Sequence, residues 1–194
     1  MVRQFFGRAN VHVIWISRKV QLGIVYRVRA YVVSLREYHQ QMANELAEVK
    51  GFKRACAIIE SDLNALPPEA FDRCFGGKAR TVADIMCEVN LVNDDVARSM
   101  RGEACVEWPE GWITAPEGQR TKEAVIAAFS ASADAIKAQI DGYTEADLDR
   151  PVTTEHGETT IRERCRFMVL HMFYHSGQLN FIQTLLGDDV WHWG

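Results

Sequence analysis

The sequence lacks the features that identify several large protein classes. No apolar run reaches the roughly 18 residues that a membrane-spanning helix needs, so we expect no membrane segment. The sequence contains neither a phosphate-binding glycine loop nor a nucleophile elbow, which argues against P-loop nucleotide-binding proteins and α/β-hydrolases. The five cysteines are scattered and form no CxxC pair, so we expect reduced thiols rather than a zinc ribbon or a disulfide framework.

Acidic residues are almost absent from the first 41 residues, which contain seven Arg or Lys and a single acid, Glu37. Since the formal net charge of the whole chain is −4, the remaining 153 residues carry −10. This acidic balance argues against nucleic acid or an anionic membrane as a partner of the folded part. The best apolar run near the start is short, and Arg18 and Lys19 follow it at once, which is unlike a secretory signal. We therefore expect a cytoplasmic protein.

The hydrophobic pattern divides the chain near Met42. Before this residue, short apolar runs are broken by Arg or Lys every seven to ten positions. After it, apolar residues recur with the 3.6-residue period of an amphipathic helix. We interpret residues 1–41 as a basic extension outside the fold, with Met42 as the functional start, and residues 42–194 as one domain.

Four amphipathic helices are predicted in this domain, over about 46–66, 81–100, 121–141 and 160–187. Pro67 and Pro68 end the first, and Thr81 caps the second. The connection at 102–119 is long and contains Trp108 and Trp112, which either form a lid or plug the end of the bundle. Four such helices with one long crossover between the second and third predict an all-α four-helix bundle.

Two histidines, His171 and His175, lie one turn apart on the last predicted helix. His175 falls within the apolar stripe and His171 beside it. Imidazoles at this spacing can ligate one metal ion if a third ligand comes from elsewhere. The alternative is a pair of packed, hydrogen-bonded core histidines, and two desolvated imidazoles are costly unless something satisfies them.

Glu88 is the acidic residue closest to the apolar stripe of the second predicted helix. It follows Ile85 by three positions and precedes Val92 by four, so its carboxylate points at or just beside the core. Helix geometry alone leaves two interpretations open, because the side chain can contribute to a site or can reach solvent or pair with an arginine. Asn93 is a further polar candidate nearby.

In this order, the helices and their motifs resemble the DinB-like (DinB/YfiT) superfamily. The resemblance covers about residues 42–187 and rests on three segments, RTVADIMCEVNLVN, YTEADLDRPV and LHMFYHSGQLNFIQTLLG. It implies a divalent metal bound by three histidines at the open end of the bundle. His171 and His175 match two of them, and Glu88 stands where the first is usually found.

The resemblance therefore implies a site of Glu88, His171 and His175 for zinc, nickel, manganese or iron. It also implies a metal-dependent enzyme, similar to the thiol-dependent S-transferases and isomerases of the family, with a small-molecule substrate and a low-molecular-weight thiol cosubstrate. Asn93 and Tyr174 are then candidate catalytic residues that orient the substrate. The alternative is a non-catalytic, metal-free bundle with a stress-related binding or dimerisation role.

A homodimer is also expected from the resemblance, because family members with this bundle often pair through helix faces. The aromatic tail at residues 191–193 would otherwise be left exposed to solvent.

Overall fold

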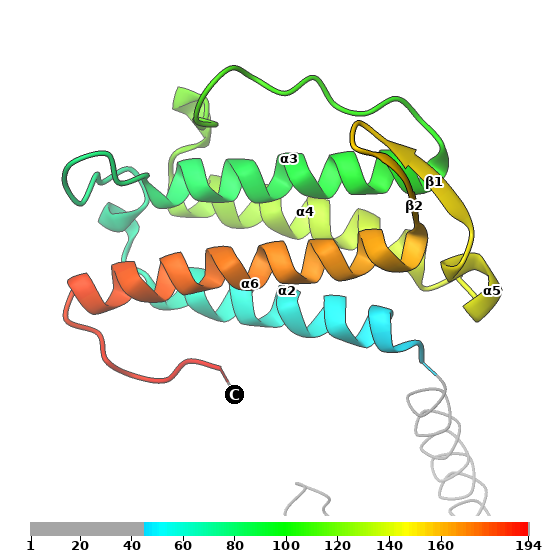
Figure 1. The fold of residues 1–194 in the computed structure, drawn as a ribbon. Coiled ribbons are helices and arrows are strands. Elements are labelled where there is room, and N and C mark those ends of the chain that lie inside the picture. The colour runs from blue at the N-terminus through cyan, green and yellow to red at the C-terminus, as the bar shows by residue number, and fades with distance from the viewer. Residues whose placement is uncertain (1–44, 194) are drawn as a thin grey trace, which may run out of the picture. The chain divides into compact units, whose positions relative to one another are not determined.

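The computed structural model describes residues 45–193, in which four long helices pack as one bundle (Figure 1). The elements are α2 (Ala47–Ala65), the 3-10 turn η1 (Pro68–Ala70), α3 (Val82–Arg101), the 3-10 turn η2 (Glu117–Gln119), α4 (Lys122–Ile140), α5 (Glu145–Leu148), β1 (Pro151–Thr154), β2 (Gly157–Thr160) and α6 (Ile161–Leu185). The predicted bundle and its long crossover between α3 and α4 are confirmed. The predicted extension at 1–41 lies outside the described residues.

Each long helix packs against two others. Helix α6 lies beside α2 and α3, and α4 lies beside α3 and α2. In Figure 1, α2 and α6 run in one direction and α3 and α4 in the other, because the crossover returns the chain to the end at which α3 began. Helices α3 and α6 are therefore antiparallel neighbours, and their facing side chains meet in the interior.

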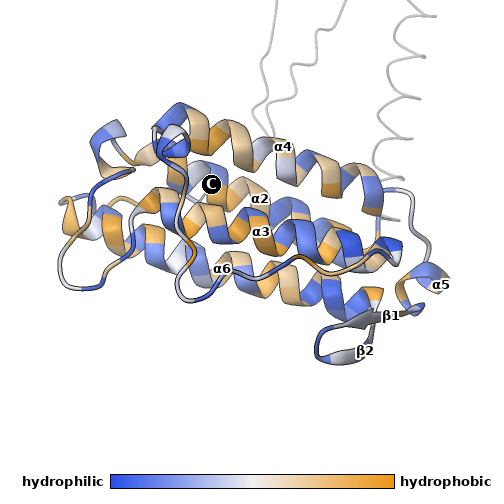
Figure 2. Ribbon diagram, turned by 90° about the horizontal axis from the view of Figure 1, so that it is seen from above, coloured by the Kyte–Doolittle hydropathy of each residue, from blue (hydrophilic) through white to orange (hydrophobic). Residues whose placement is uncertain are grey.

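The amphipathic pattern of the sequence accounts for the core. Apolar and polar bands alternate along each long helix in Figure 2, as a period of 3.6 residues requires. The predicted inward positions of α3 and α4 are all buried: Val82, Ile85, Met86, Val89, Val92, Val96, Met100, Val125, Phe129, Ala133, Ile136 and Ile140. Within residues 45–193, no helix combines the length and the hydropathy that crossing a membrane requires.

The helix ends follow local chemistry. The hydroxyl of Thr81 accepts the backbone N–H of Asp84, which confirms the predicted N-cap, and the hydroxyl of Thr160 accepts the N–H of Glu163 in the same way. After α6, Gly187 adopts a φ of 85°. A left-handed residue at this position, with the N–H of the next residue donating to Gln183 O, forms the Schellman end of a helix.

A short antiparallel hairpin, which the helical patterns did not predict, precedes α6. Strands β1 and β2 pair with Pro151 opposite Thr160 and Thr154 opposite Gly157. Strands of four residues are too short to show a clear alternation in the sequence. Arg150 Nη2 donates to Met100 O at 3.0 Å, which ties the start of the hairpin to the last turns of α3.

Candidate metal centre

A buried ion pair holds α6 in register against α3. Arg164 Nη2 donates to Asp95 Oδ2 at 2.7 Å, and Arg164 Nε donates to Ser99 Oγ at 3.1 Å. Glu88 lies seven residues before Asp95, and His171 lies seven residues after Arg164. Seven residues make about two turns, or roughly 10 Å. Because the two helices are antiparallel, this ion pair sets Glu88 opposite the histidines.

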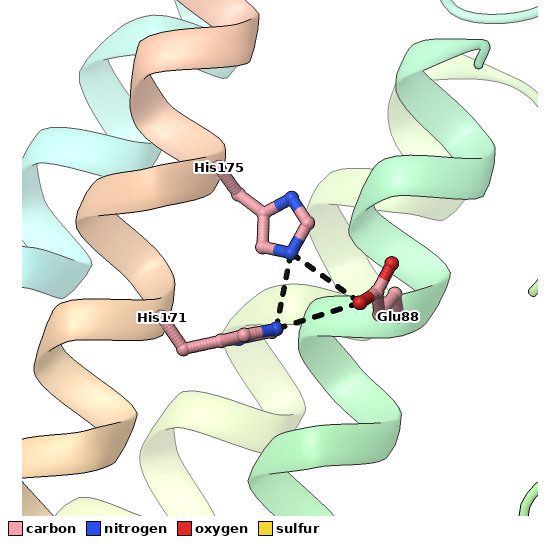
Figure 3. A group of neighbouring side chains, drawn as sticks. All are labelled: Glu88, His171 and His175. Carbon is pink, nitrogen blue, oxygen red and sulfur yellow. Dashed lines mark hydrogen bonds and ion pairs between the residues drawn. The ribbon is translucent and has the colours of Figure 1, made fainter.

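The three predicted metal ligands converge on one point (Figure 3). The Nε2 atoms of His171 and His175 lie 3.0 Å apart, and Glu88 Oε1 lies 3.6 and 3.7 Å from them. Ligand atoms bound tetrahedrally to zinc at about 2.1 Å stand roughly 3.4 Å from one another. The three atoms therefore have a spacing that fits a single divalent ion.

A hydrogen bond to Gln178 fixes the tautomer of His175. Its side chain is fully buried, and Nδ1 lies 2.9 Å from Gln178 Oε1. An amide oxygen only accepts, so Nδ1 carries the proton and Nε2 presents a lone pair. This is the tautomer that a metal ligand needs, and a partner for the second ring nitrogen is the usual way to hold it.

His171 shares a proton with His175. Since His175 Nε2 accepts, the 3.0 Å contact makes His171 Nε2 the donor. The Nδ1 atom of His171 is then unprotonated, and it is buried without a hydrogen-bond partner among residues 45–193. The ring of Phe167 stacks on His171 with the centroids 5.9 Å apart. The two Nε2 atoms are thus hydrogen-bonded to each other, whereas Nδ1 of His171 has no hydrogen-bond partner within residues 45–193.

Arg80 holds the carboxylate of Glu88. Its Nη1 donates to Glu88 Oε2, and its Nη2 donates to Asp84 O at 2.7 Å. The Arg80 and Glu88 side chains are 10% and 23% exposed, so the pair is largely shielded from water. Oε1 is left facing the two imidazoles. Glu88 therefore pairs with an arginine, as one interpretation had it, and its second oxygen also lies beside the two histidines.

The charges around the cluster favour the deprotonated ligands. Burial raises the pKa of Glu88, but the hydrogen bond and charge of Arg80, helped by both imidazoles, outweigh it and hold the pKa below its usual value. Burial lowers the pKa of His175 to about 4, and the neighbouring His171 adds to the shift. Burial also lowers the pKa of His171 against the opposing charge of Glu88. At neutral pH Glu88 is thus ionised and both imidazoles are neutral, and an ion would bind Nε2 of His171 only after its proton moves to Nδ1.

The two predicted catalytic candidates lie in different surroundings. Asn93 is fully buried, and its Nδ2 donates to Ser132 Oγ of α4 at 3.3 Å. Tyr174 is 63% exposed, and its ring centroid is 5.0 Å from that of His175. Of the two, Tyr174 is the one with a contact to the cluster.

The crossover tryptophans do not plug the bundle, since Trp108 and Trp112 are 38% and 70% exposed. The ring of Trp112 instead lies over the guanidinium of Arg80, with 5.2 Å from Cζ to the ring centroid. The crossover therefore covers the residue that holds Glu88.

Sequence reasoning missed Arg80 and Gln178. Gln178 follows His175 by three positions, a spacing at which helical side chains meet, so its role could have been read from the sequence. Arg80 precedes the cap of α3 and lies outside any helical period, so no pattern pointed to it.

Comparisons with known proteins agree with this architecture. A sequence model of the family described as the DinB superfamily matches residues 51–179. A comparison with curated proteins found no match.

Among solved structures, a DinB-like protein from Bacillus cereus ATCC 10987 is 10% identical, with a TM-score of 0.59 over 72% of this chain and 91% of its own. A conserved protein from Enterococcus faecalis is 15% identical, with a TM-score of 0.56 over 72% and 95%. A DinB-like protein from Bacillus subtilis is 14% identical, with a TM-score of 0.51 over 73% and 93%. At these identities the likeness shows a shared fold.

Proposed function

The chain belongs to the DinB superfamily, and on this premise we propose that it is a divalent-metal-dependent enzyme whose ion is held by Glu88, His171 and His175. The observation that supports this most directly is the convergence of two imidazole nitrogens and one carboxylate oxygen, with 3.0 to 3.7 Å between them. The depressed pKa values of both histidines add support, because neutral imidazole is the form that binds metal.

The donor set determines the chemistry that we propose. Two imidazoles and a carboxylate suit zinc, nickel, manganese or iron. Three protein ligands would leave room for water or a thiol, whose pKa a bound ion would lower. We propose thiol-dependent S-transferase or isomerase chemistry on a small molecule, with a low-molecular-weight thiol as cosubstrate. The exposed ring of Tyr174 beside His175 is suited to contact such a substrate.

A metal-free bundle with a binding or dimerisation role is the second candidate, and two contacts favour it. Arg80 already neutralises Glu88, and the two imidazoles already share a hydrogen bond. Protein groups alone therefore satisfy most of the charges and hydrogen bonds of the cluster. A site that depended on an ion would not need these contacts.

Thermal melts distinguish the two candidates. The full chain is stripped with EDTA and then melted with zinc, nickel or manganese. An ion that binds only the folded state adds RT ln(1 + [L]/Kd), about 2.7 kcal/mol at a hundredfold excess over Kd. For a domain of this size, this raises Tm by roughly 5 to 10 °C.

Variants test whether the rise in Tm on adding an ion comes from the cluster. His171→Ala and His175→Ala abolish the increment, and Glu88→His retains or increases it. The control is His156→Ala, which removes a loop histidine whose side chain is 85% exposed. If no ion shifts the wild type while Glu88→His gains a shift, the protein is a metal-free member. If neither responds, the three residues form no metal site.

A further inference from the structure

A pocket of about 480 Å³ adjoins the metal centre and shares its walls. Three of its lining residues also contact the cluster. Arg80 donates to Glu88, Gln178 accepts from His175, and the ring of Tyr174 packs against His175. A molecule in this pocket would therefore lie one side chain away from the ligand atoms.

The walls of the pocket are largely apolar and include large rings that are open to solvent. Trp112 and Phe181 line it and are 70% and 64% exposed, and Ile85 and Ile182 contribute buried aliphatic surface. Pockets of roughly this size, with apolar walls and few polar groups, are typical of small-molecule sites. A flat apolar ligand would bury ring surface that the protein leaves in water.

The charged groups that line the pocket are both cationic. They are Lys78 and Arg80, and no lining residue is acidic. Lys78 is exposed and has no carboxylate partner within the part of the chain that the structure describes. The Nε atom of Arg80 is buried and makes no hydrogen bond to any of those residues. Arg80 is already paired with Glu88, so Lys78 is the cation left to meet a ligand, and a ligand with one negative charge would complement it.

A glycine inside α6 keeps the pocket open. Gly177 lines the pocket, and a Cβ added there would meet no atom within 4 Å. Its φ is not positive, so neither the backbone conformation nor packing requires glycine. Glycine within a helix costs about 1 kcal/mol relative to alanine. The position that would fill the pocket with a side chain is thus left empty at a cost to helix stability.

We propose that this pocket binds an organic anion with a flat apolar body, of the aromatic carboxylate class, and that such a molecule is the substrate presented to the metal centre. The role as substrate rests on the proposed function. Binding itself depends on Lys78, Trp112 and the space above Gly177, and it needs no ion.

Calorimetric titration of the full chain in EDTA tests this proposal, with 2-naphthoate as the anion and 2-naphthamide as its neutral isostere. An exposed charge contributes less than about 1 kcal/mol, so we expect naphthoate to bind about threefold more tightly than the amide. Trp112→Ala should weaken both ligands, because it removes apolar wall.

Gly177→Leu fills the pocket and should weaken naphthoate at least tenfold, with Tm equal to or above that of the wild type. Gly177→Ala is the matched control, since it improves the helix and adds a single methyl group. Lys78→Gln should weaken naphthoate about threefold, as expected for an exposed charge, and should leave the amide unchanged. Lys50→Gln removes an exposed charge from α2 and should change neither.

Equal affinity for the two ligands, or full naphthoate affinity in a folded Gly177→Leu protein, overturns the proposal. So does an equal effect of Lys50→Gln and Lys78→Gln, because it reveals an effect of net charge alone. The same preparations are also melted with zinc. If naphthoate binds but zinc does not raise Tm, the anion pocket is supported and the metal centre is rejected. If zinc raises Tm but naphthoate does not bind, the metal centre is supported and the anion pocket is rejected.

Discussion

Replacing Arg164 tests whether the buried ion pair holds α6 against α3. Arg164 and Asp95 are 9% and 8% exposed, and they meet at 2.7 Å. In Arg164→Met the apolar stem is largely kept, and the hydrogen bond that Asp95 keeps within residues 45–193 comes from Val106 N–H at 3.2 Å. The variant therefore leaves a carboxylate buried without a counter-charge.

The expected loss is large for one substitution. Breaking a buried ion pair by removing one partner costs about 3 to 5 kcal/mol, or roughly 10 °C in Tm for a domain of this size. Removing both charges, as Asp95→Leu with Arg164→Met, should recover most of this loss, because no unpaired charge remains. The residual cost is about 1 kcal/mol, from the donor at Val106 that loses its acceptor.

Urea unfolding of the wild type, both single variants and the double variant gives the coupling energy directly. Arg166→Met is the matched control, since the Arg166 side chain is 59% exposed and its ion pairs should contribute less than about 1 kcal/mol. If Arg164→Met is no more destabilising than Arg166→Met, the ion pair does not hold the register. A zinc response that disappears in the stable double variant would further tie this register to the metal centre.

Three further outcomes are expected. In EDTA, the free energy of unfolding should be highest above pH 6.5 and decrease toward pH 4. In this range the unfolded chain protonates His175, whereas the folded chain, in which the pKa of His175 is about 4, does not. Melts of His175→Gln should lose part of this pH dependence, and the exposed-loop control His156→Gln should keep it. A chain that begins at Met42 should keep the full-length Tm within about 3 °C, less than a loss of roughly 1.5 kcal/mol would produce, and a larger drop would mean that residues 1–41 stabilise the bundle. Light scattering should return twice the 22.0 kDa of one chain, since Leu170, Phe181 and Leu185 of α6 are more than half exposed, and a monomer at micromolar concentration would contradict the proposed homodimer.

Local patterns predicted much of the fold, because each helix carries its own periodicity and caps. The stripe on α6 was read correctly from Ile161 to Ile182, including the burial of His175. Contacts between distant segments were not predictable in the same way. The aromatic tail was expected to dock on the bundle or on a second subunit, and Trp193 Nε1 donates to Asp62 Oδ1 of α2 at 2.9 Å. Nothing in the local sequence around Asp62 identifies a partner 131 residues away.

In the candidate site, too, local positions were predictable from the sequence and contacts between distant segments were not. Helical spacing placed His171 and His175 on one face, and the resemblance added Glu88, but no periodicity could show that Arg80 binds the same carboxylate. Arg80 lies in the turn before α3, where side-chain direction depends on the tertiary fold. Residues that support a site from a loop are therefore the ones that a sequence pattern misses.

Arg80 explains how a carboxylate can stand where the family usually has a histidine. An unpaired carboxylate beside two buried imidazoles would carry a desolvation cost, and its pKa would rise. With Arg80 on Oε2, Glu88 and Arg80 together carry no net charge, as a neutral histidine would. A divalent ion would then meet the same total charge as in a three-histidine site. Since Arg80 occupies Oε2, Glu88 has only Oε1 to offer toward the imidazoles, so Arg80 both stabilises the ion-free cluster and competes with an ion for the carboxylate.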